Sequence, residues 1–329
     1  NKKKVLITTV PFAKHDTLPL ELLKNRGYEY VINPLNKKLR EEELLEMVSD
    51  FDVIIAGTEK ISSAIMDRAP KLKLISRVGI GLDGVDLIAA KQRGIQVSYT
   101  PDAPTKAVAE MTLGSMLTLL RSVHLSNIRM HNGEWHRYFG RRIAETTIGI
   151  IGLGRIGLEV LNYLKGLNVP KILLNDIEIK QDFFLDSNIE WATKQKIYKD
   201  ADIVSLHIPL TAQTKNMITK DELLMMKDDA MIINTSRGGI INEKDLYEVM
   251  KSGHLSGSAI DVFDFEPYTG RLQEIERCLI TAHMGSMSLD CRTRMEIEAT
   301  QEAVRFLENE TLQGIVPQYE YDLQEDDKI

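Results

Sequence analysis

The spacing of three glycines in the stretch TIGIIGLGRIG, residues 147–157, restricts the fold of this chain more than any other feature. An apolar run precedes Gly152 and a helical pattern follows Gly154, so the stretch predicts a strand, a tight turn and a helix. The first glycine permits the turn, and Gly157 lets the helix pack closely on the strand. Such a unit predicts an α/β fold with a parallel sheet.

Strand-like and helix-like segments alternate along the rest of the chain. Near-continuous apolar strands separated by helices favour parallel sheets that are covered by helices on both faces. The predicted strands are residues 5–10, 53–57, 72–79, 95–100, 147–152, 171–176, 202–209, 230–236, 257–263 and 278–283. Helical patterns occupy residues 18–27, 62–69, 85–94, 105–123 and 294–310. The fold class is therefore predicted as α/β, with two doubly wound parallel-sheet domains.

The segment TPDAP, residues 100–104, separates the two alternating series. Two prolines flank an aspartate that can start a turn, and a long helical pattern follows. We expect the last helix to return to the first domain. One domain then comprises residues 1–99 plus 289–329, and the other comprises residues 100–288. The acidic tail QYEYDLQEDDKI, residues 318–329, is predicted to be a mobile end.

Composition narrows the class of protein. With 329 residues, 43% of them hydrophobic and 27% charged, the chain resembles an ordinary globular protein. The net charge of −7 disfavours nucleic-acid binding, which needs a clustered excess of Lys and Arg. The longest apolar run, MTLGSMLTLL, is too short for a bilayer, and NKKKVLITTV lacks the pattern of a secretion signal. Cys278 and Cys291 make no disulfide framework, so we expect a cytoplasmic protein without nucleic-acid or membrane partners.

The glycine turn also predicts a dinucleotide site. Gly154 lets a pyrophosphate approach the backbone, where N–H groups at the start of the helix can bind it. Asp176 lies at the end of the next predicted strand, where a carboxylate binds the ribose hydroxyls. This carboxylate and Glu178 repel a 2′-phosphate, and Lys180 is the only nearby cation, so NAD is favoured over NADP.

Three further strand ends carry polar residues. Arg237 follows the strand in INTSRGG, and His283 ends the strand in ITAHMGS. Asp261 and Glu266 follow a third strand in AIDVFDFEP. In an open parallel sheet, ligands bind beyond the carboxyl ends of the strands, so these side chains are placed to meet a cofactor and its substrate.

These residue types suit the reduction of a 2-oxo acid by NADH. Arg237 can bind a carboxylate with two parallel hydrogen bonds, and His283 can give or take a proton near neutral pH. A carboxylate such as Glu266, bonded to the imidazole, would orient it and stabilise its protonated form. Metal catalysis is not predicted, because the chain has no HExxH motif and no Cys/His cluster.

Together these segments resemble the D-isomer-specific 2-hydroxyacid dehydrogenase family. The resemblance rests on IIGLGRIG, NTSRGG, SAIDVFDFEP and TAHMGS, with SRVGIGLDGVDLIAAKQRGI upstream, and covers nearly the whole chain. It implies an NAD-dependent dehydrogenase with a flavodoxin-like substrate lobe and a Rossmann-like NAD lobe. The catalytic residues would be Arg237, Glu266 and His283. The resemblance also implies a homodimer, with much of the contact built by PDAPTKAVAEMTLG, residues 101–114.

The same resemblance assigns binding residues. Asp261 would contact the nicotinamide amide, and backbone N–H groups near Val78 and Gly79 would bind the substrate carboxylate. The implied cofactor-binding residues are Gly152, Gly154, Arg155, Ile156, Gly157, Asp176, His207, Ile208, Pro209, Thr235, Ser236, Asp261 and Gly285. The implied substrate-binding residues are Arg77, Val78, Gly79 and Ile80.

Within the family, the segments AGTEKI, TPDAPT, EPYTG and RMEIEA most resemble D-3-phosphoglycerate dehydrogenases, without their appended regulatory domain. This favours 3-phosphoglycerate and 3-phosphohydroxypyruvate as the substrate pair. Arg77 matches those enzymes, whereas the arginine that they have near Ala56 is missing. Lys60, Arg77 or a basic residue of the partner's RRI, residues 141–143, would then bind the phosphate.

Other functions remain open on the sequence. One is a glyoxylate or hydroxypyruvate reductase, or another D-2-hydroxyacid dehydrogenase. A second is a dehydrogenase for a different donor, such as formate or phosphite. A third is a non-catalytic NAD-sensing protein like the corepressors related to this family, which keep the same three residues. Ala282 and Met284 stand where the family often has Pro and Ile, and would alter only the shape of the pocket.

Overall fold

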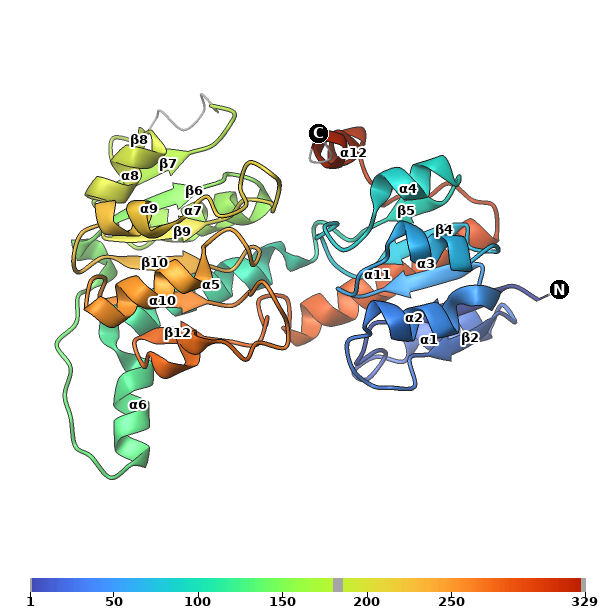
Figure 1. Cartoon of the computed structure of the whole chain (residues 1–329), viewed down its shortest axis with the longest axis horizontal. Helices are drawn as coiled ribbons and strands as arrows, with labels where there is room; N and C mark the ends of the chain where they lie inside the picture. The colour runs from blue at the N-terminus through green and yellow to red at the C-terminus, as the bar shows by residue number, and fades with distance from the viewer. Residues whose placement is uncertain (1, 180–185, 327–329) are drawn as a thin grey trace. The chain divides into compact units, whose positions relative to one another are not determined.

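The computed structural model describes residues 2–179 and 186–326 (Figure 1). The chain divides into two compact units. Unit 1 comprises Asn1–Pro104 and Ser286–Ile329, and unit 2 comprises Thr105–Gly285. The sequence-based boundaries, after residues 99 and 288, lie close to these breaks. Each unit is an α/β layer structure around a parallel sheet, which confirms the predicted fold class.

Unit 1 contains a five-stranded parallel sheet with the strand order β2-β1-β3-β4-β5. All residues of its central strands β3 and β4 are buried, as expected for strands covered on both faces, and all but Ser76 and Arg77 are apolar. Only the edge strand β2 alternates between exposed and half-buried residues. The strands are β1 (Lys4–Ile7), β2 (Glu29–Ile32), β3 (Val53–Ala56), β4 (Leu74–Arg77) and β5 (Gln96–Ser98).

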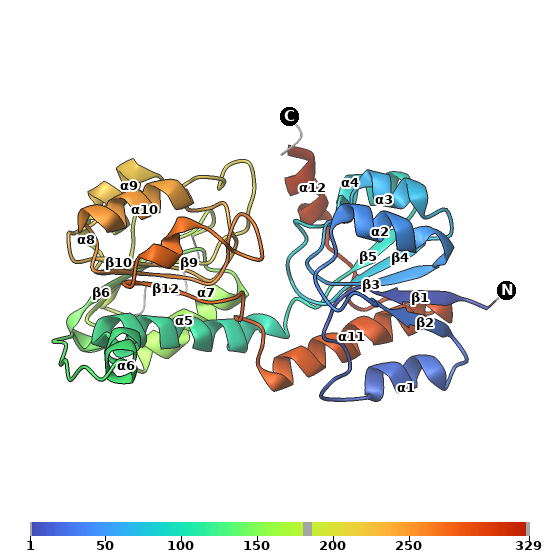
Figure 2. The same cartoon turned by 60° about the horizontal axis from the view of Figure 1, so that its bottom comes forward.

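Helices cover both faces of this sheet. In Figure 2, α1 and α11 lie on one face, and α2, α3 and α4 lie on the other. The long α11 packs on the sheet at Ser76, whose hydroxyl donates to the Ala299 carbonyl at 2.7 Å. The predicted return of the last long helix to the first unit is thus observed. The helices are α1 (Leu18–Lys24), α2 (Glu41–Met47), α3 (Ser63–Arg68), α4 (Leu87–Gln92), α11 (Leu289–Leu307) and α12 (Gln318–Asp326), with a short 3-10 turn, η1 (Val48–Asp50).

The prediction that residues 318–329 form a mobile end is wrong for the described part. Residues Gln318–Asp326 form α12, and Tyr321 packs partly buried against the core of unit 1. The Gln324 amide donates to the carbonyls of Leu82 and Val85 at 3.1 and 2.9 Å. Its oxygen accepts from Leu87 N–H at 2.9 Å. The packing of Tyr321 and the hydrogen bonds of Gln324 therefore hold in place an acidic segment that composition alone predicts to be a mobile tail.

Unit 2 contains a seven-stranded parallel sheet with the strand order β12-β11-β10-β9-β6-β7-β8. The order reverses between β9 and β6, which is the switch point where such sheets bind ligands. The strands are β6 (Thr147–Ile151), β7 (Lys171–Asn175), β8 (Ile189–Trp191), β9 (Ile203–Leu206), β10 (Met231–Asn234), β11 (Gly257–Ile260) and β12 (Cys278–Ile280). Every predicted strand after residue 146 has its counterpart here.

Two apolar cores fill the space between this sheet and its helices. One core joins the sheet to α8, α9 and α10, and the other joins it to α5 and α7 (Figure 2). The helices α6, α8, α9 and α10 and the short β8 were not among the predicted elements. The helices are α5 (Pro104–Arg121), α6 (Val123–His131), α7 (Arg155–Lys165), α8 (Lys194–Asp200), α9 (Lys220–Met225) and α10 (Glu243–Ser252), with the 3-10 turns η2 (Ile143–Glu145) and η4 (Arg271–Glu274).

Candidate active site

The turn between β6 and α7 requires glycine at two of its three glycine positions. Gly152 has a φ of 96°, and a Cβ there would lie 2.2 Å from the backbone oxygen of His207. A Cβ at Gly157 would lie 2.0 Å from the backbone oxygen of Gly152. These contacts are the close packing of turn, helix and neighbouring strand that the motif predicts.

Gly154 differs from the other two glycines, because a Cβ there would meet no heavy atom within 4 Å. It is the N-cap of α7 and provides no side-chain cap for the first-turn N–H groups. The positive end of the helix dipole therefore faces a space that a side chain would fill. This open cradle fits the pyrophosphate of a dinucleotide, with Arg155 and Ile156 in the first turn of α7.

Asp176 follows β7 and binds the glycine turn directly. Its Oδ2 accepts a hydrogen bond from Leu153 N–H at 2.5 Å, and its Oδ1 accepts one from Glu178 N–H at 3.1 Å. The half-buried carboxylate keeps acceptor capacity for ribose hydroxyls, because an ionised carboxylate has about four lone-pair sites. Glu178 is exposed, and Lys180 lies outside the described residues.

His207, at the end of β9, closes the other side of the turn. Its Nε2 lies 2.8 Å from the Ser205 hydroxyl. Burial lowers the pKa of His207 to about 4, so the ring is neutral at physiological pH. Ile208 is half-buried and Pro209 is exposed, so this segment presents an apolar rim beside Gly152.

The loop after β10 is held by Asn234, which the sequence-based reasoning did not single out. The Asn234 Oδ1 accepts hydrogen bonds from the backbone N–H and the hydroxyl of Ser236, at 3.0 and 2.7 Å. Its Nδ2 donates to the Arg237 carbonyl at 2.8 Å. The buried Thr235 hydroxyl lies 2.7 Å from that of Thr112 on α5. One amide side chain thus shapes the loop that carries Arg237.

Arg237 is half-buried beside the loop that carries Glu266. Its Nη1 donates to the Ser236 carbonyl at 2.6 Å. A Cβ at the next residue, Gly238, would lie 2.0 Å from the backbone oxygen of Phe263. The Arg237 loop can therefore pack against the backbone of the loop after β11, so three strand ends are joined at one edge of the sheet.

His283 and Glu266 form the predicted pair. The Nδ1 of His283 lies 2.9 Å from Oε2 and 3.1 Å from Oε1 of Glu266. Glu266 also accepts a hydrogen bond from Phe263 N–H at 3.2 Å, which fixes the carboxylate on its own loop. Because Nδ1 is occupied, the ring has Nε2 as the nitrogen through which it can exchange a proton with a substrate.

The backbone at His283 is strained, with a φ of 51°. Asp261, which is 2% exposed, holds the chain on both sides of it. Its Oδ1 accepts from the Thr281 hydroxyl at 2.6 Å and from Met284 N–H at 2.8 Å. Its Oδ2 accepts from Gly285 N–H at 2.8 Å. The carboxylate that the sequence assigned to the cofactor thus also clamps the loop of the catalytic candidate.

Two further acidic side chains surround this pair. The pKa of Glu243 is raised mainly by burial, and the neighbouring charges of Asp264 and Glu266 raise it further. Burial also raises the pKa of Asp264. Glu243 accepts a hydrogen bond from Asp264 N–H at 2.8 Å, so it anchors the same loop.

In unit 1, the predicted substrate-binding residues form a tight turn after β4. The Arg77 side chain is buried and donates to the Val78 carbonyl. The N–H of Val78 donates to the Ala56 carbonyl, and that of Gly79 donates to the Thr100 hydroxyl, both at 2.8 Å. Gly79 has a φ of 135°, and a Cβ there would lie 2.8 Å from the Arg77 guanidinium. The Arg77 side chain therefore packs against the turn.

The other cations considered for a phosphate have acidic partners. Lys60 pairs with Glu41 at 3.3 Å. Arg141 pairs with Asp202 at 3.2 Å, and Arg142 lies 3.9 Å from Glu145. Each would have to exchange its partner in order to bind a phosphate.

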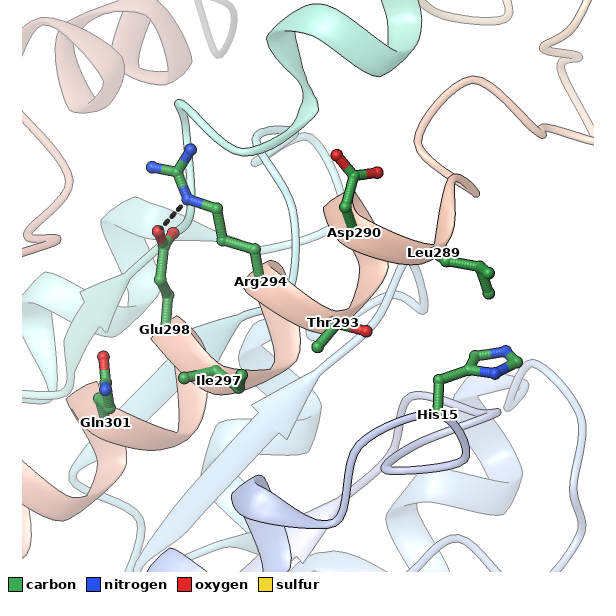
Figure 3. A pocket seen from close by; sticks show the side chains of 8 residues that line it. All are labelled: His15, Leu289, Asp290, Thr293, Arg294, Ile297, Glu298 and Gln301. Carbon is green, nitrogen blue, oxygen red and sulfur yellow. Dashed lines mark hydrogen bonds and ion pairs between the residues drawn. The ribbon is translucent and has the colours of Figure 1, made fainter.

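Unit 1 also has an open groove of about 630 Å³ along one face of α11 (Figure 3). Its lining is separate from every predicted site residue. The lining residues are His15, Leu289, Asp290, Thr293, Arg294, Ile297, Glu298 and Gln301. Within the described residues, no cluster of His, Cys, Asp and Glu could hold a metal, and no helix has the length and apolar character needed to cross a membrane.

Comparisons with known proteins agree with this geometry. The family model of the D-isomer specific 2-hydroxyacid dehydrogenase, NAD binding domain, matches residues 113–285. The D-3-phosphoglycerate dehydrogenase of Methanocaldococcus jannaschii is 34% identical over 284 residues, which are 84% of this chain but only 54% of that protein. The chain therefore spans about half the length of that relative. The glyoxylate reductase of Thermofilum pendens is 35% identical over 285 residues, 84% of both chains.

Solved structures give the same assignment. The TT0316 protein of Thermus thermophilus has a TM-score of 0.86 and 31% identity, and the match covers 95% of this chain and all of that one. The NAD-dependent formate dehydrogenase of Staphylococcus aureus, solved with NAD, has a TM-score of 0.83 and 29% identity, with 95% and 99% covered. The chain therefore belongs to the D-isomer specific 2-hydroxyacid dehydrogenase family of NAD-dependent oxidoreductases.

Proposed function

We propose that this protein interconverts a small D-2-hydroxy acid and its 2-oxo acid, with Arg237, Glu266 and His283 as its catalytic residues. The observation that carries the proposal is the His283–Glu266 pair, 2.9 Å apart, on the same sheet edge as the glycine turn. A titratable group, an orienting carboxylate and a nearby guanidinium are the parts that carbonyl reduction needs.

The cofactor supplies the hydride when it is bound. The first turn of α7 after Gly154 would hold the pyrophosphate, and Asp176 would hold the ribose hydroxyls. Asp261 uses three of its acceptor sites for the loop after β12, which leaves Oδ2 able to accept one further donor, such as the nicotinamide amide. The proposed cofactor-binding role of unit 2 rests on the first turn of α7, Asp176 and Asp261.

During reduction, His283 would give its Nε2 proton to the oxygen that becomes the alkoxide. Glu266 bonds Nδ1, so it stabilises the imidazolium before transfer and fixes the direction of Nε2. Arg237 would bind the substrate carboxylate and polarise the carbonyl. In the oxidative direction the same imidazole, now neutral, would take the hydroxyl proton.

Unit 1 would recognise the substrate carboxylate through its turn at Val78, Gly79 and Ile80. The N–H groups of Val78 and Gly79 already have acceptors, at 2.8 Å each. The Ile80 N–H has no acceptor among the described residues, so we propose it as the first of the three to bind the substrate. In this proposal, as in the expectation from the sequence, unit 1 binds the substrate and unit 2 binds NAD.

For the substrate, we propose an unphosphorylated 2-oxo acid of the glyoxylate or hydroxypyruvate size. Arg77 is buried, and Lys60 and Arg141 have carboxylate partners. A phosphate carries two charges near neutral pH and needs cations that are available to it. The phosphohydroxypyruvate pair stays the second candidate, because a relative named D-3-phosphoglycerate dehydrogenase is 34% identical.

A homodimer is proposed for the solution state. In unit 2, several large apolar side chains on and after α6 are exposed, among them Trp135 at 81% and Phe139 at 103%. An apolar patch of this kind on a soluble surface is typical of a protein–protein contact. Sedimentation of the wild type against a Trp135→Ser, Phe139→Ser variant tests it, since the variant should be monomeric at concentrations where the wild type is dimeric.

The substrate proposal is tested by NADH oxidation with glyoxylate, hydroxypyruvate and phosphohydroxypyruvate. We expect the highest kcat/KM with an unphosphorylated acid. Arg77→Ala should lower kcat/KM for all three substrates by a similar factor, because the side chain supports the turn. A preference of the wild type for phosphohydroxypyruvate, together with a loss in Arg77→Ala confined to that substrate, would establish the phosphoglycerate reading instead.

A further inference from the structure

The loop between β11 and η4 carries Glu266 but has no regular structure of its own. It is folded around one aromatic side chain, Tyr268. We infer that Tyr268 is a positioning residue that holds Glu266 against His283. The inference rests on the proposed function, in which this pair exchanges the proton.

Tyr268 closes the loop at both ends. Its ring stacks on Phe263, with centroids 4.0 Å apart and an interplanar angle of 18°. Its hydroxyl accepts a hydrogen bond from Leu272 N–H, at 3.1 Å, at the start of η4. The half-buried ring thus links Phe263, in the loop after β11, to the turn that leads into β12.

Gly270 shows how closely the ring lies on the loop. A Cβ at this position would be 2.3 Å from the Tyr268 hydroxyl and 2.4 Å from the ring carbon that bears it. Since Gly270 has a φ of −88°, backbone strain does not require glycine there, and the close approach of Tyr268 does. Within the EPYTG segment, Gly270 therefore leaves the space that the Tyr268 ring occupies.

Phe263 connects this arrangement to the catalytic pair. Its ring receives the Tyr268 stack, while its N–H donates to the Glu266 carboxylate at 3.2 Å. The same carboxylate meets His283 Nδ1 at 2.9 Å. Movement of Phe263 would therefore shift the carboxylate relative to the imidazole. Glu243 anchors the loop through the adjoining Asp264 N–H, whereas Tyr268 acts on Phe263 through the ring stack.

The consequence is specific to proton transfer. When the stack is lost, Glu266 orients the imidazole less well and stabilises its protonated form less. The glycine turn and Asp176 lie after other strands, so NADH binding should be unaffected. Misplacement of a catalytic group by about 1 Å can lower the rate by about 10²-fold.

The test compares Tyr268→Leu, which removes the stack and the hydroxyl, with Tyr268→Phe, which keeps the stack. We expect Tyr268→Leu to lower kcat by about tenfold or more, with the Kd for NADH unchanged, and to move the pH optimum of reduction downward. Tyr268→Phe should show a smaller loss. Tyr247→Phe is the matched control, because the hydroxyl that it removes bonds Glu274 and Arg271 on the same η4 turn.

A double-mutant cycle separates positioning from general support. In Glu266→Gln, adding Tyr268→Leu should cost little further activity, because the tyrosine acts through that carboxylate. Independent, multiplicative losses would overturn the inference, as would loss of NADH binding or an unchanged pH profile. If Tyr268→Leu does not fold, Phe263→Leu decides, because it removes the other ring of the stack and keeps the backbone N–H that bonds Glu266: wild-type kcat and pH profile in that variant overturn the inference.

A second readout does not depend on turnover. The NMR titration of His283, identified by its absence in His283→Gln, should move to lower pH in Tyr268→Leu. If the wild type reduces no 2-oxo acid, the proposed function is wrong, whereas the titration still reports whether Tyr268 holds the pair. An unshifted His283 titration in active, folded Tyr268→Leu contradicts the positioning role of Tyr268 and leaves the proposed function standing.

Discussion

Asp261→Asn is the change that best tests how the His283 loop is held. The substitution keeps the size of the side chain and replaces one carboxylate oxygen with an N–H donor. If the nitrogen took the place of Oδ1, the bonds to Thr281 and Met284 would be disturbed together. The least disruptive orientation therefore puts it at Oδ2, where it faces the Gly285 N–H that now donates at 2.8 Å.

The expected effect follows from the lost bond. A hydrogen bond to a charged group contributes about 1.5–3 kcal/mol, and the remaining bonds lose their ionic character, so we expect a loss of about 2–4 kcal/mol in the stability of unit 2. For a domain of this size, each kcal/mol lowers Tm by about 2–4 °C. The transition of unit 2 should therefore fall by about 4–16 °C.

Differential scanning calorimetry measures this shift in Tm. The kcat of the variant reports whether the loop still holds His283 in its active position. The left-handed φ of 51° at His283 loses its support, so kcat should fall by more than tenfold. Thr281→Val is the matched control, because it removes only the 2.6 Å bond to Oδ1 and should cost about 1 kcal/mol. If Asp261→Asn melts within about 2 °C of the wild type, no more than the shift expected of that weak control, the clamp contributes little.

Three further outcomes are expected. Asp176→Ala should narrow the preference for NAD over NADP, measured as a ratio of kcat/KM values, and equal values in the wild type would contradict the assignment. His207 has a pKa of about 4 in the fold against 6.5 when unfolded, so its contribution to stability is complete above about pH 6.5 and is lost as pH falls towards 4. His207→Asn should therefore flatten the fall in the free energy of unfolding, measured by urea denaturation, between about pH 7 and pH 5, a fall of about 1–2 kcal/mol. Burial raises the pKa of the thiols of Cys278 and Cys291 to about 11, so neither should react with Ellman's reagent in the native protein near neutral pH, and fast labelling without unfolding would contradict their burial.

The local requirements of the fold could be predicted from the sequence. The glycine turn was predictable because Gly152 and Gly157 avoid backbone atoms that the strand–turn–helix unit itself brings close. The edge strands β2 and β8, one in each sheet, were harder to predict. β2 and β8 are short and incompletely buried, so they lack the continuous apolar pattern of the central strands.

Longer-range contacts escaped prediction for a different reason. The helix α12 depends on Gln324, whose partners at Leu82 and Val85 are far away in the chain. The support that Asn234 gives to the Arg237 loop depends on the bend after β10, which side-chain type alone does not reveal. Arg77 was expected to face a ligand, and its burial beside Gly79 follows from the tight turn.

The pairing of His283 with Glu266 was predictable because parallel strands end at one edge of the sheet. Both residues lie just beyond strands that are neighbours in it, β11 and β12. The clamp by Asp261 was not foreseen. Its three bonds reach residues 20 or more positions away, and their geometry exists only after the loop has folded.

The central claim is that His283 transfers the substrate proton. The most direct measurement compares 2-oxo acid reduction by the wild type and by His283→Gln, with NADH binding followed in parallel by fluorescence. We expect His283→Gln to bind NADH with the wild-type Kd and to lose kcat by about 10²-fold or more. Near-normal turnover in a folded His283→Gln variant would contradict the claim, and NADH binding by the wild type without turnover of any 2-oxo acid would favour an NAD-sensing protein.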